Sequence, residues 1–347
     1  MSAEKRKSIF IRALAFFLVA VFLLGVLELA ARSSDPYLRR LRGMKNPFWQ
    51  THPLRGHSLK PGDYGSIWGI PFHINQLGFR SPEIEKQKPA GVFRVFCLGD
   101  SITMGPALPS SVLYPEVLQG LLSQKYPGKT FEVINAGASG YGIKEELLLL
   151  KEDGLSLSPD LVVLQHTIYD VPGTSFYDHI NPHRDVPVPG KKFLVAHFAI
   201  ARFVLERYDR LGLKNDLFGL AHYLDMPPDS DAARRIEQGW EQYFKQLSEM
   251  SELCRKNNIA FLVLIIPHRA QFEDRRQVFM PQKKLLAFCK ENNIAAIDPV
   301  SVYQSQKRYP FLFDPVHPNM EGHKILAQLI EDWMEKNMIS AQPSENP

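Results

Sequence analysis

A serine in the first third of the chain has the surroundings of a catalytic nucleophile. Ser101 follows Gly99 and Asp100, directly after an apolar run that begins at Val92. Such a run is typical of a strand buried on both faces, and open α/β sheets place their active sites where strands end. A serine hydroxyl becomes an effective nucleophile only when a base takes its proton. The sequence therefore predicts that Ser101 is a nucleophile whose base comes from another part of the chain.

The candidate base lies near the other end of the chain. Asp314 precedes His317 by three residues, in a loop interrupted by prolines. An imidazole takes the serine proton, and a carboxylate fixes the tautomer of the imidazole and stabilises its charged form. Asp314 and His317 can share one turn, whereas Ser101 must reach them through the fold. The pattern predicts a triad of these three residues; the alternative is an ordinary turn aspartate and a loop histidine.

In this order along the chain, these segments resemble the sequence blocks of the SGNH subgroup of the GDSL hydrolases. The resemblance runs from about Val92 to Met334. It implies a flavodoxin-like, three-layer α/β/α fold with a parallel sheet, and acyl transfer from an ester without a cofactor. The positions that match the blocks are Gly99, Asp100, Ser101, Asn135, Ala136, Gly137, Asp170, Asp314 and His317.

The resemblance also implies donors for the oxyanion that forms when the serine attacks. Two are the backbone N–H groups of Ser101 and Gly137. Where the family shows Gly-x-Asn-Asp, this chain reads Thr-Ile-Tyr-Asp, so Tyr169 stands where a donating asparagine is expected. Losing one oxyanion donor costs about 10²–10³ in rate. The third donor is therefore the Tyr169 hydroxyl, or Gln165 or Thr167 nearby, or it is missing from a weaker or more selective catalyst.

Three further polar residues are predicted to support the site. Asp100 is expected to hydrogen-bond the backbone around the serine turn. Asn135 and Asp170 are expected at the ends of the next two strands, beside Ser101.

Strand and helix patterns alternate along most of the chain. This alternation predicts a parallel sheet with right-handed crossovers, which brings the predicted site residues together at the carboxyl ends of the strands. After the strand at Val92, the expected elements are helix Val112–Lys125, strand Thr130–Asn135, helix Lys144–Gly154, strand Leu161–Gln165, helix Ala232–Asn257, strand Ala260–Pro267, helix Pro281–Asn292, strand Ile294–Asp298 and a last helix Gly322–Trp333.

The N-terminus carries an apolar segment long enough to cross a bilayer. Residues 1–8 are basic, and residues 9–31 are almost free of charge. We predict an uncleaved transmembrane signal anchor with the catalytic domain on the extracytoplasmic side, as in a bacterial envelope protein. The alternative is a cleaved signal peptide.

Four further regions complete the predicted organisation. Residues 32–90 form an extended collar of short strands, and residues 91–340 form the hydrolase domain. An insertion at about 171–230 leaves the sheet near the serine and is predicted to act as a lid or substrate wall. Residues 341–347 are a C-terminal tail. Within the collar, the segment 75–83 resembles one that precedes the catalytic block in membrane-anchored members of the family; its Asn75, Gly78 and Arg80 either rim the site or pack the collar on the domain.

Composition excludes several functions. The 347 residues are 45% hydrophobic with a formal charge of +4, which fits a globular domain. The sequence has no basic stripe of the kind that indicates a nucleic-acid partner. The three cysteines lie in apolar patterns, which argues against disulfides. We also predict no metal site, because no pair has a convincing ligand spacing among His166, Asp170, His179, His183 and Asp185.

Three functions follow from these residues. The first is a serine esterase acting on acylated envelope carbohydrate or lipid. The second is an O-acyltransferase that passes the acyl group to a sugar hydroxyl with the same triad. The third is an acyl- or carbohydrate-binding module with little or no catalysis.

Overall fold

The computed structural model describes residues 3–34, 48–67, 70–167, 170–171, 231–273, 279–307, 310–312 and 316–339. Tyr169 and Asp314 lie outside these residues, as do the predicted insertion beyond residue 171 and the tail 341–347. The described residues fall into two compact units. The N-terminal helix α1 (Ala3–Ser34) belongs to one unit, and the residues from Phe48 onward belong to the other.

A five-stranded parallel sheet forms the centre of the second unit. Its spatial order is β6-β5-β7-β8-β9, so the first strand of the sheet lies between the second and the third. This is the doubly wound order of flavodoxin-like sheets, and it confirms the predicted fold class. The strands are β5 (Val92–Gly99), β6 (Thr130–Gly137), β7 (Leu161–His166), β8 (Ala260–Ile265) and β9 (Ala295–Ile297).

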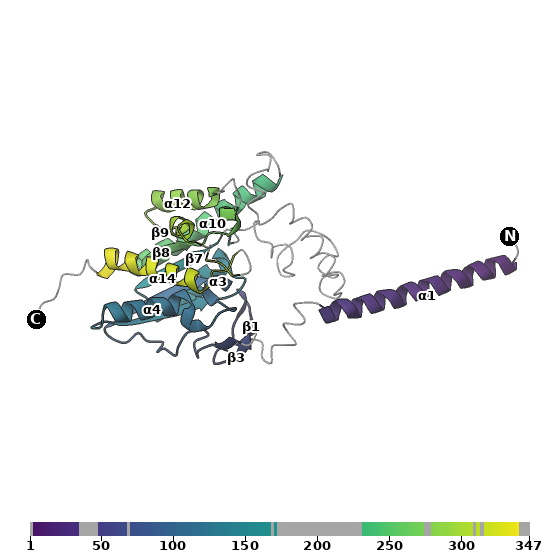
Figure 1. Ribbon diagram of the computed structural model, residues 1–347, viewed down its shortest axis with the longest axis horizontal. Coiled ribbons are helices and arrows are strands. Elements are labelled where there is room, and N and C mark those ends of the chain that lie inside the picture. Colours follow the sequence, from purple (N-terminus) through teal and green to yellow (C-terminus); the bar gives the residue numbers. More distant parts are fainter. Residues whose placement is uncertain are drawn as a thin grey trace, which may run out of the picture. The chain divides into compact units, whose positions relative to one another are not determined.

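Helices cover both faces of this sheet, as Figure 1 shows. Successive side chains of β5 point to opposite faces: Val95 and Cys97 pack in one apolar cluster, and Phe96 and Leu98 pack in the other. The first cluster includes residues of α4 (Tyr114–Lys125) and α14 (Met320–Met334). The second includes residues of α5 (Ile143–Leu149), α10 (Asp231–Lys256) and α12 (Met280–Glu291). Burial on both faces explains why Val95 to Leu98 are all apolar in the sequence.

Short helices complete the connections between these elements. The predicted helix Lys144–Gly154 is α-helical only to Leu149 and continues as a π-helical turn. The predicted strand at Ala260 ends at Ile265, before Pro267, which has no N–H to donate to a neighbouring strand. The short elements are α3 (Ser101–Met104), α11 (Ala270–Glu273), α13 (Val300–Gln304), the 3₁₀ turns Ser110–Val112 and Leu155–Leu157, and the π turns Leu150–Gly154 and Glu335–Ile339.

Two antiparallel hairpins precede the sheet and make up the described part of the collar. They are β1 (Trp49–His52) with β2 (Gly56–Leu59), and β3 (Tyr64–Ile67) with β4 (Ile70–His73).

Arg80 ties the collar to the hydrolase domain. Its buried guanidinium donates to the backbone oxygens of Met104, the last residue of the helix that begins at Ser101, and of Gly105 and Leu108 beyond it. Asn75 stabilises the turn before it by accepting from the N–H groups of residues 77 and 79. Through these contacts Asn75 and Arg80 pack the collar on the domain, which is one of the two roles that the sequence predicts for them.

Helix α1 is apolar along most of its length. The 26 residues Lys5–Ala30 are long and apolar enough to cross a membrane. At 1.5 Å per residue they span about 39 Å, more than the roughly 30 Å of a bilayer core. A helix of this kind at an N-terminus fits a membrane anchor or a signal sequence.

We expect Glu116→Gln to stabilise the protein at high pH. Both carboxylate oxygens of Glu116 are buried without a hydrogen-bond partner among the described residues, and burial raises the pKa of Glu116 to about 8 from an ordinary 4.5. Between these two values the unfolded chain releases the proton and the folded chain keeps it, so the free energy of unfolding falls as pH rises. Glutamine has no charge to bury, so the gain is about 1–3 kcal/mol at pH 9 and close to zero at pH 4. Urea unfolding at the two pH values measures this, and an equal gain at both contradicts the explanation.

Candidate active site

Ser101 lies at the carboxyl end of β5, where the chain turns into α3. Asp100 caps this short helix: its Oδ1 accepts from the N–H of Ile102 at 2.7 Å, as the sequence predicts for a residue that supports the turn. The N–H of Asp100 donates to Gln165 Oε1 on the neighbouring strand β7 at 3.2 Å. Because β5 and β7 flank the point where the strand order reverses, Ser101 occupies the position at which doubly wound sheets bind their ligands.

His317 reaches Ser101 from the far end of the sequence. The Ser101 Oγ lies 2.8 Å from His317 Nε2 across a separation of 216 residues. Two features hold the loop of His317: Leu312 N–H donates to His317 O at 2.8 Å, and Phe311 pairs with Pro318 in an isolated β-bridge. The distance lies within the range for a hydroxyl that donates to an imidazole. Asp314 lies outside the described residues.

Asn135 and Gly137 sit at the end of β6, beside α3. The Asn135 side chain donates to Thr103 O at 2.7 Å and accepts from the N–H of Gly137 at 3.2 Å. A Cβ on Gly137 would overlap the backbone nitrogen of Met104, so a glycine is needed for this close packing. The N–H of Gly137 is therefore engaged inside the protein, which differs from its predicted role as an oxyanion donor.

In the turn that follows β6, one N–H group has no acceptor among the described residues. The N–H groups of Ala138, Ser139, Tyr141 and Gly142 each have an acceptor. The N–H of Gly140 has none among the described residues, and Gly140 has a φ of +82°, which favours glycine. Ser139 donates to the Met104 sulfur at 3.3 Å, so the turn lies against the helix of Ser101. The N–H of Ser101 also has no acceptor in the described part of the chain. Gly140 is thus a better candidate than Gly137 for a donor beside Ser101.

Asp170 closes the turn that follows β7. Its Oδ2 accepts from the N–H of Thr167 at 2.6 Å, and its own N–H donates to Thr167 O at 3.0 Å. Buried beside this turn, Thr167 Oγ1 and Gln165 Nε2 have no hydrogen-bond partner among the residues described. Asp170 therefore supports the backbone here, while the third oxyanion donor remains a choice among Tyr169, Thr167 and Gln165.

Two buried titratable groups, Glu146 and His166, lie next to this turn. Burial, with Asp170 and Asp100 nearby, raises the pKa of Glu146 well above its ordinary value. Burial lowers the pKa of His166 to about 3, which keeps that ring neutral. Glu146 is not among the site residues predicted from the sequence, although its spacing of three from Ile143 and four from Leu150 indicates an inward-facing position. Across the described ranges, no group of three His, Cys, Asp or Glu side chains is arranged to hold a metal ion.

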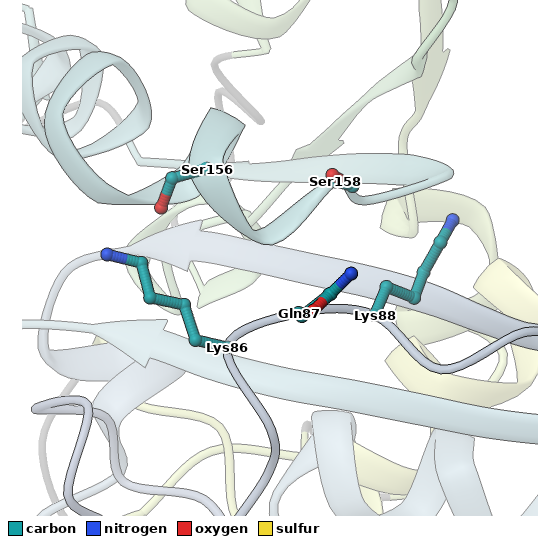
Figure 2. A pocket seen from close by; sticks show the side chains of 5 residues that line it. All are labelled: Lys86, Gln87, Lys88, Ser156 and Ser158. Atoms are coloured by element: carbon teal, nitrogen blue, oxygen red, sulfur yellow. The ribbon is translucent and has the colours of Figure 1, made fainter.

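A separate cavity of about 530 Å³ lies at the opposite edge of the sheet. Its lining residues are Lys86, Gln87, Lys88, Ser156 and Ser158 (Figure 2). These residues precede β5 and β7, whereas Ser101 follows β5. In a parallel sheet the two ends of the strands lie on opposite edges. The cavity is therefore distinct from the Ser101–His317 site.

The comparisons with known proteins assign the chain to a family. The family model described as GDSL-like Lipase/Acylhydrolase family matches residues 97–325, more than half of the chain. The chain therefore belongs to this family, within the SGNH/GDSL superfamily of ester-hydrolysing enzymes. Among curated proteins, none matches the chain significantly.

Several solved structures are similar to this chain at low sequence identity. Axe2, an acetyl xylan esterase from Geobacillus stearothermophilus, is 18% identical in a variant form, with a TM-score of 0.42 over 71% of this chain and 95% of that one. A putative lipolytic protein of the G-D-S-L family from Desulfitobacterium hafniense is 17% identical, with a TM-score of 0.41 over 69% and 98%. LAE5, an alpha/beta hydrolase from the metagenome of Lake Arreo, Spain, is 16% identical, with a TM-score of 0.44 over 69% and 93%.

Proposed function

We propose that this protein hydrolyses carboxylic esters with Ser101 as nucleophile, His317 as general base and then acid, and Asp314 as the residue that orients His317. The observation that carries the proposal is the 2.8 Å contact between Ser101 Oγ and His317 Nε2 at the carboxyl edge of the sheet. A serine and a histidine from opposite ends of the sequence meet in the geometry that proton transfer requires.

The reaction has two halves. Ser101 Oγ attacks the ester carbonyl carbon while its proton passes to His317 Nε2. The tetrahedral intermediate collapses to an acyl-serine, and the leaving alcohol takes that proton. Water, deprotonated by His317, then attacks the acyl-serine, and His317 returns that proton to Ser101 Oγ as the acid leaves. The residues need no cofactor for these steps.

The oxyanion of each intermediate needs fixed N–H donors. We assign the role of oxyanion donor to the N–H groups of Ser101 and Gly140, because both lack an internal acceptor among the described residues. Gly137 is not assigned this role, because its N–H is bonded to Asn135. Asp100, Asn135 and Asp170 hold the backbone around these donors.

We expect Tyr169→Phe to slow the reaction if the Tyr169 hydroxyl is the third donor. The change removes one hydroxyl, so kcat and kcat/KM should fall together by about 10–10²-fold, as expected when an interaction made only in the transition state is lost. Steady-state kinetics on a slow ester, with chemistry as the limiting step, measures this. Equal rates for wild type and variant assign the role to Thr167 or Gln165, and Thr167→Val is then the matching change.

The proposed setting is the bacterial envelope. A basic N-terminus followed by one apolar helix is the usual layout of a signal anchor, which supports placing the catalytic domain on the extracytoplasmic side. Acylated carbohydrate or lipid of the envelope is the proposed substrate.

An acyl-donor screen tests the reaction and separates it from transfer. Full-length protein in detergent is given aryl acetate, butyrate and octanoate esters, with and without oligosaccharide acceptors, and the free acid and acylated sugar are measured. Release of acid at the same rate with and without acceptor supports hydrolysis. Acyl-sugar formed at the expense of acid indicates an O-acyltransferase, and turnover of none of the esters, together with no labelling of Ser101 by a fluorophosphonate, indicates a binding module.

A further inference from the structure

The free N–H of Gly140 belongs to the central peptide of a tight turn. Tyr141 N–H donates to Ala138 O at 3.1 Å, and Gly140 has a φ of +82°, so the turn has the features of type II with Ser139 and Gly140 at its two central positions. The carbonyl of Ser139 and the N–H of Gly140 are parts of one planar trans peptide group and point in opposite directions. A contact that fixes the carbonyl therefore fixes the direction of the N–H.

His57, on the collar strand β2, makes this contact. Its Nε2 lies 2.9 Å from Ser139 O, and because a carbonyl only accepts, Nε2 must carry the proton. Tyr141 also contacts His57: its hydroxyl donates to His57 O at 2.6 Å, and the two rings pack edge to face with their centroids 5.1 Å apart. Two hydrogen bonds and a ring contact thus join the collar to the residues on both sides of Gly140.

We propose that His57 is a positioning residue for ester hydrolysis, which holds the Ser139–Gly140 peptide with its N–H directed to the oxyanion. The inference rests on the proposed function, because it gives that N–H its role. The first part of the argument is the alternative turn. Rotation of the central peptide converts type II into type I, and a glycine permits both conformations. In the rotated turn the Ser139 carbonyl would take the place of the N–H and repel the oxyanion. The His57 hydrogen bond exists only in the unrotated turn and stabilises it.

The second part concerns the strength of the donor. A peptide whose carbonyl accepts a hydrogen bond is polarised, so its N–H becomes a better donor. His57 thus favours the oxyanion both by orientation and by polarisation, without touching the substrate. Its effect should appear in the transition state and not in substrate binding.

The test compares two replacements of His57 in the full-length chain. His57→Phe keeps a ring against Tyr141 and removes the donor, whereas His57→Gln keeps an N–H donor at a similar reach. We expect the Phe variant to lower kcat and kcat/KM by about tenfold with KM unchanged, a part of the 10²–10³ that loss of a whole oxyanion donor costs. We expect Gln to restore the rate to within about threefold of wild type. A trifluoromethyl ketone, which forms a tetrahedral adduct with a serine, should bind the Phe variant weaker by the same factor as the loss in kcat/KM.

Arg55→Met is the matched control for packing of the collar. Arg55 lies two residues from His57 and pairs with Glu152 and Asp153, and although it lies near the Tyr141 side chain it makes no hydrogen bond to the Ser139–Gly140 peptide among the described residues. This change should lower the Tm and leave kcat unaltered. The inference is overturned if His57→Phe keeps the wild-type kcat, or if the losses in His57→Phe, His57→Gln and Arg55→Met follow Tm alone. If wild type hydrolyses esters and labels at Ser101 while every His57 variant matches it, the proposed function stands and only the role of His57 falls. If wild type does neither, both fall together.

Discussion

Ser101→Ala is expected to reduce ester hydrolysis by about 10⁴-fold or more, because removal of the nucleophile leaves only the oxyanion donors and substrate binding. The same change should abolish labelling by a fluorophosphonate probe, which reacts with an activated serine. The fold should survive. The variant loses one partly buried hydrogen bond, worth about 1 kcal/mol, and leaves the cap of Asp100 on Ile102 in place.

The measurement pairs initial rates with mass spectrometry of the labelled peptide. Ser156→Ala is the matched control, since Ser156 is an exposed serine that lines the cavity at the opposite edge of the sheet. It should keep full activity and full labelling. Hydrolysis that persists in Ser101→Ala at near the wild-type rate, with an unchanged Tm, would show that the 2.8 Å contact with His317 is structural and that another group performs the chemistry.

Local patterns were sufficient to predict the order of strands and helices. In the strand that begins at Val92, residues Val95 to Leu98 are all apolar and buried, and the helix after it carries Leu118 and Leu122 four residues apart on its buried face. Such apolar patterns are visible in the sequence because the buried faces of strands and helices must be apolar. The ends of elements were predicted less well: β6 continues to Gly137 because Asn135 to Gly137 pair with Cys97 to Gly99, a contact between strands that the sequence of either one does not reveal.

The contact between Ser101 and His317 agrees with what residue types and spacing predict. The candidate oxyanion donor differs from the prediction, which named Gly137 and not Gly140. Gly137 and Gly140 are both small, and both follow Asn135 in the same short segment. What separates them is the use of their N–H groups. The Asn135 side chain folds back on Gly137, and the positive φ of Gly140 leaves its N–H without an acceptor among the described residues. These facts depend on hydrogen-bond geometry, which spacing alone does not encode.

The role proposed for His57 could not be predicted from the sequence either. Its partner Ser139 lies 82 residues away, and neither residue belongs to a block that matches the family. A histidine in a collar of short strands has no local signal for a role in catalysis. Only the fold shows that its Nε2 reaches the peptide next to the proposed oxyanion donor.

Asp314→Asn is expected to lower kcat by about 10⁴-fold while leaving the fold intact. With Nε2 of His317 facing Ser101, the proton of the neutral ring must sit on Nδ1, where a carboxylate can accept it. An asparagine can present its amide N–H to Nδ1 instead. The ring proton then moves to Nε2, and that nitrogen can no longer accept the proton of Ser101.

The loop that carries both residues makes this change informative. Leu312 N–H bonds to His317 O, and Phe311 pairs with Pro318, so described residues on both sides of the loop hold the backbone of His317. A loss of activity in Asp314→Asn with an unchanged Tm therefore reports on the tautomer and not on the loop. Asp298→Asn is the matched control: Asp298 accepts from Val300 N–H at 3.0 Å, a bond that an amide oxygen also makes, so activity should stay at the wild-type level. If Asp314→Asn retains more than about a tenth of the wild-type kcat, the tautomer of His317 is set by another group, and the site works as a serine–histidine dyad.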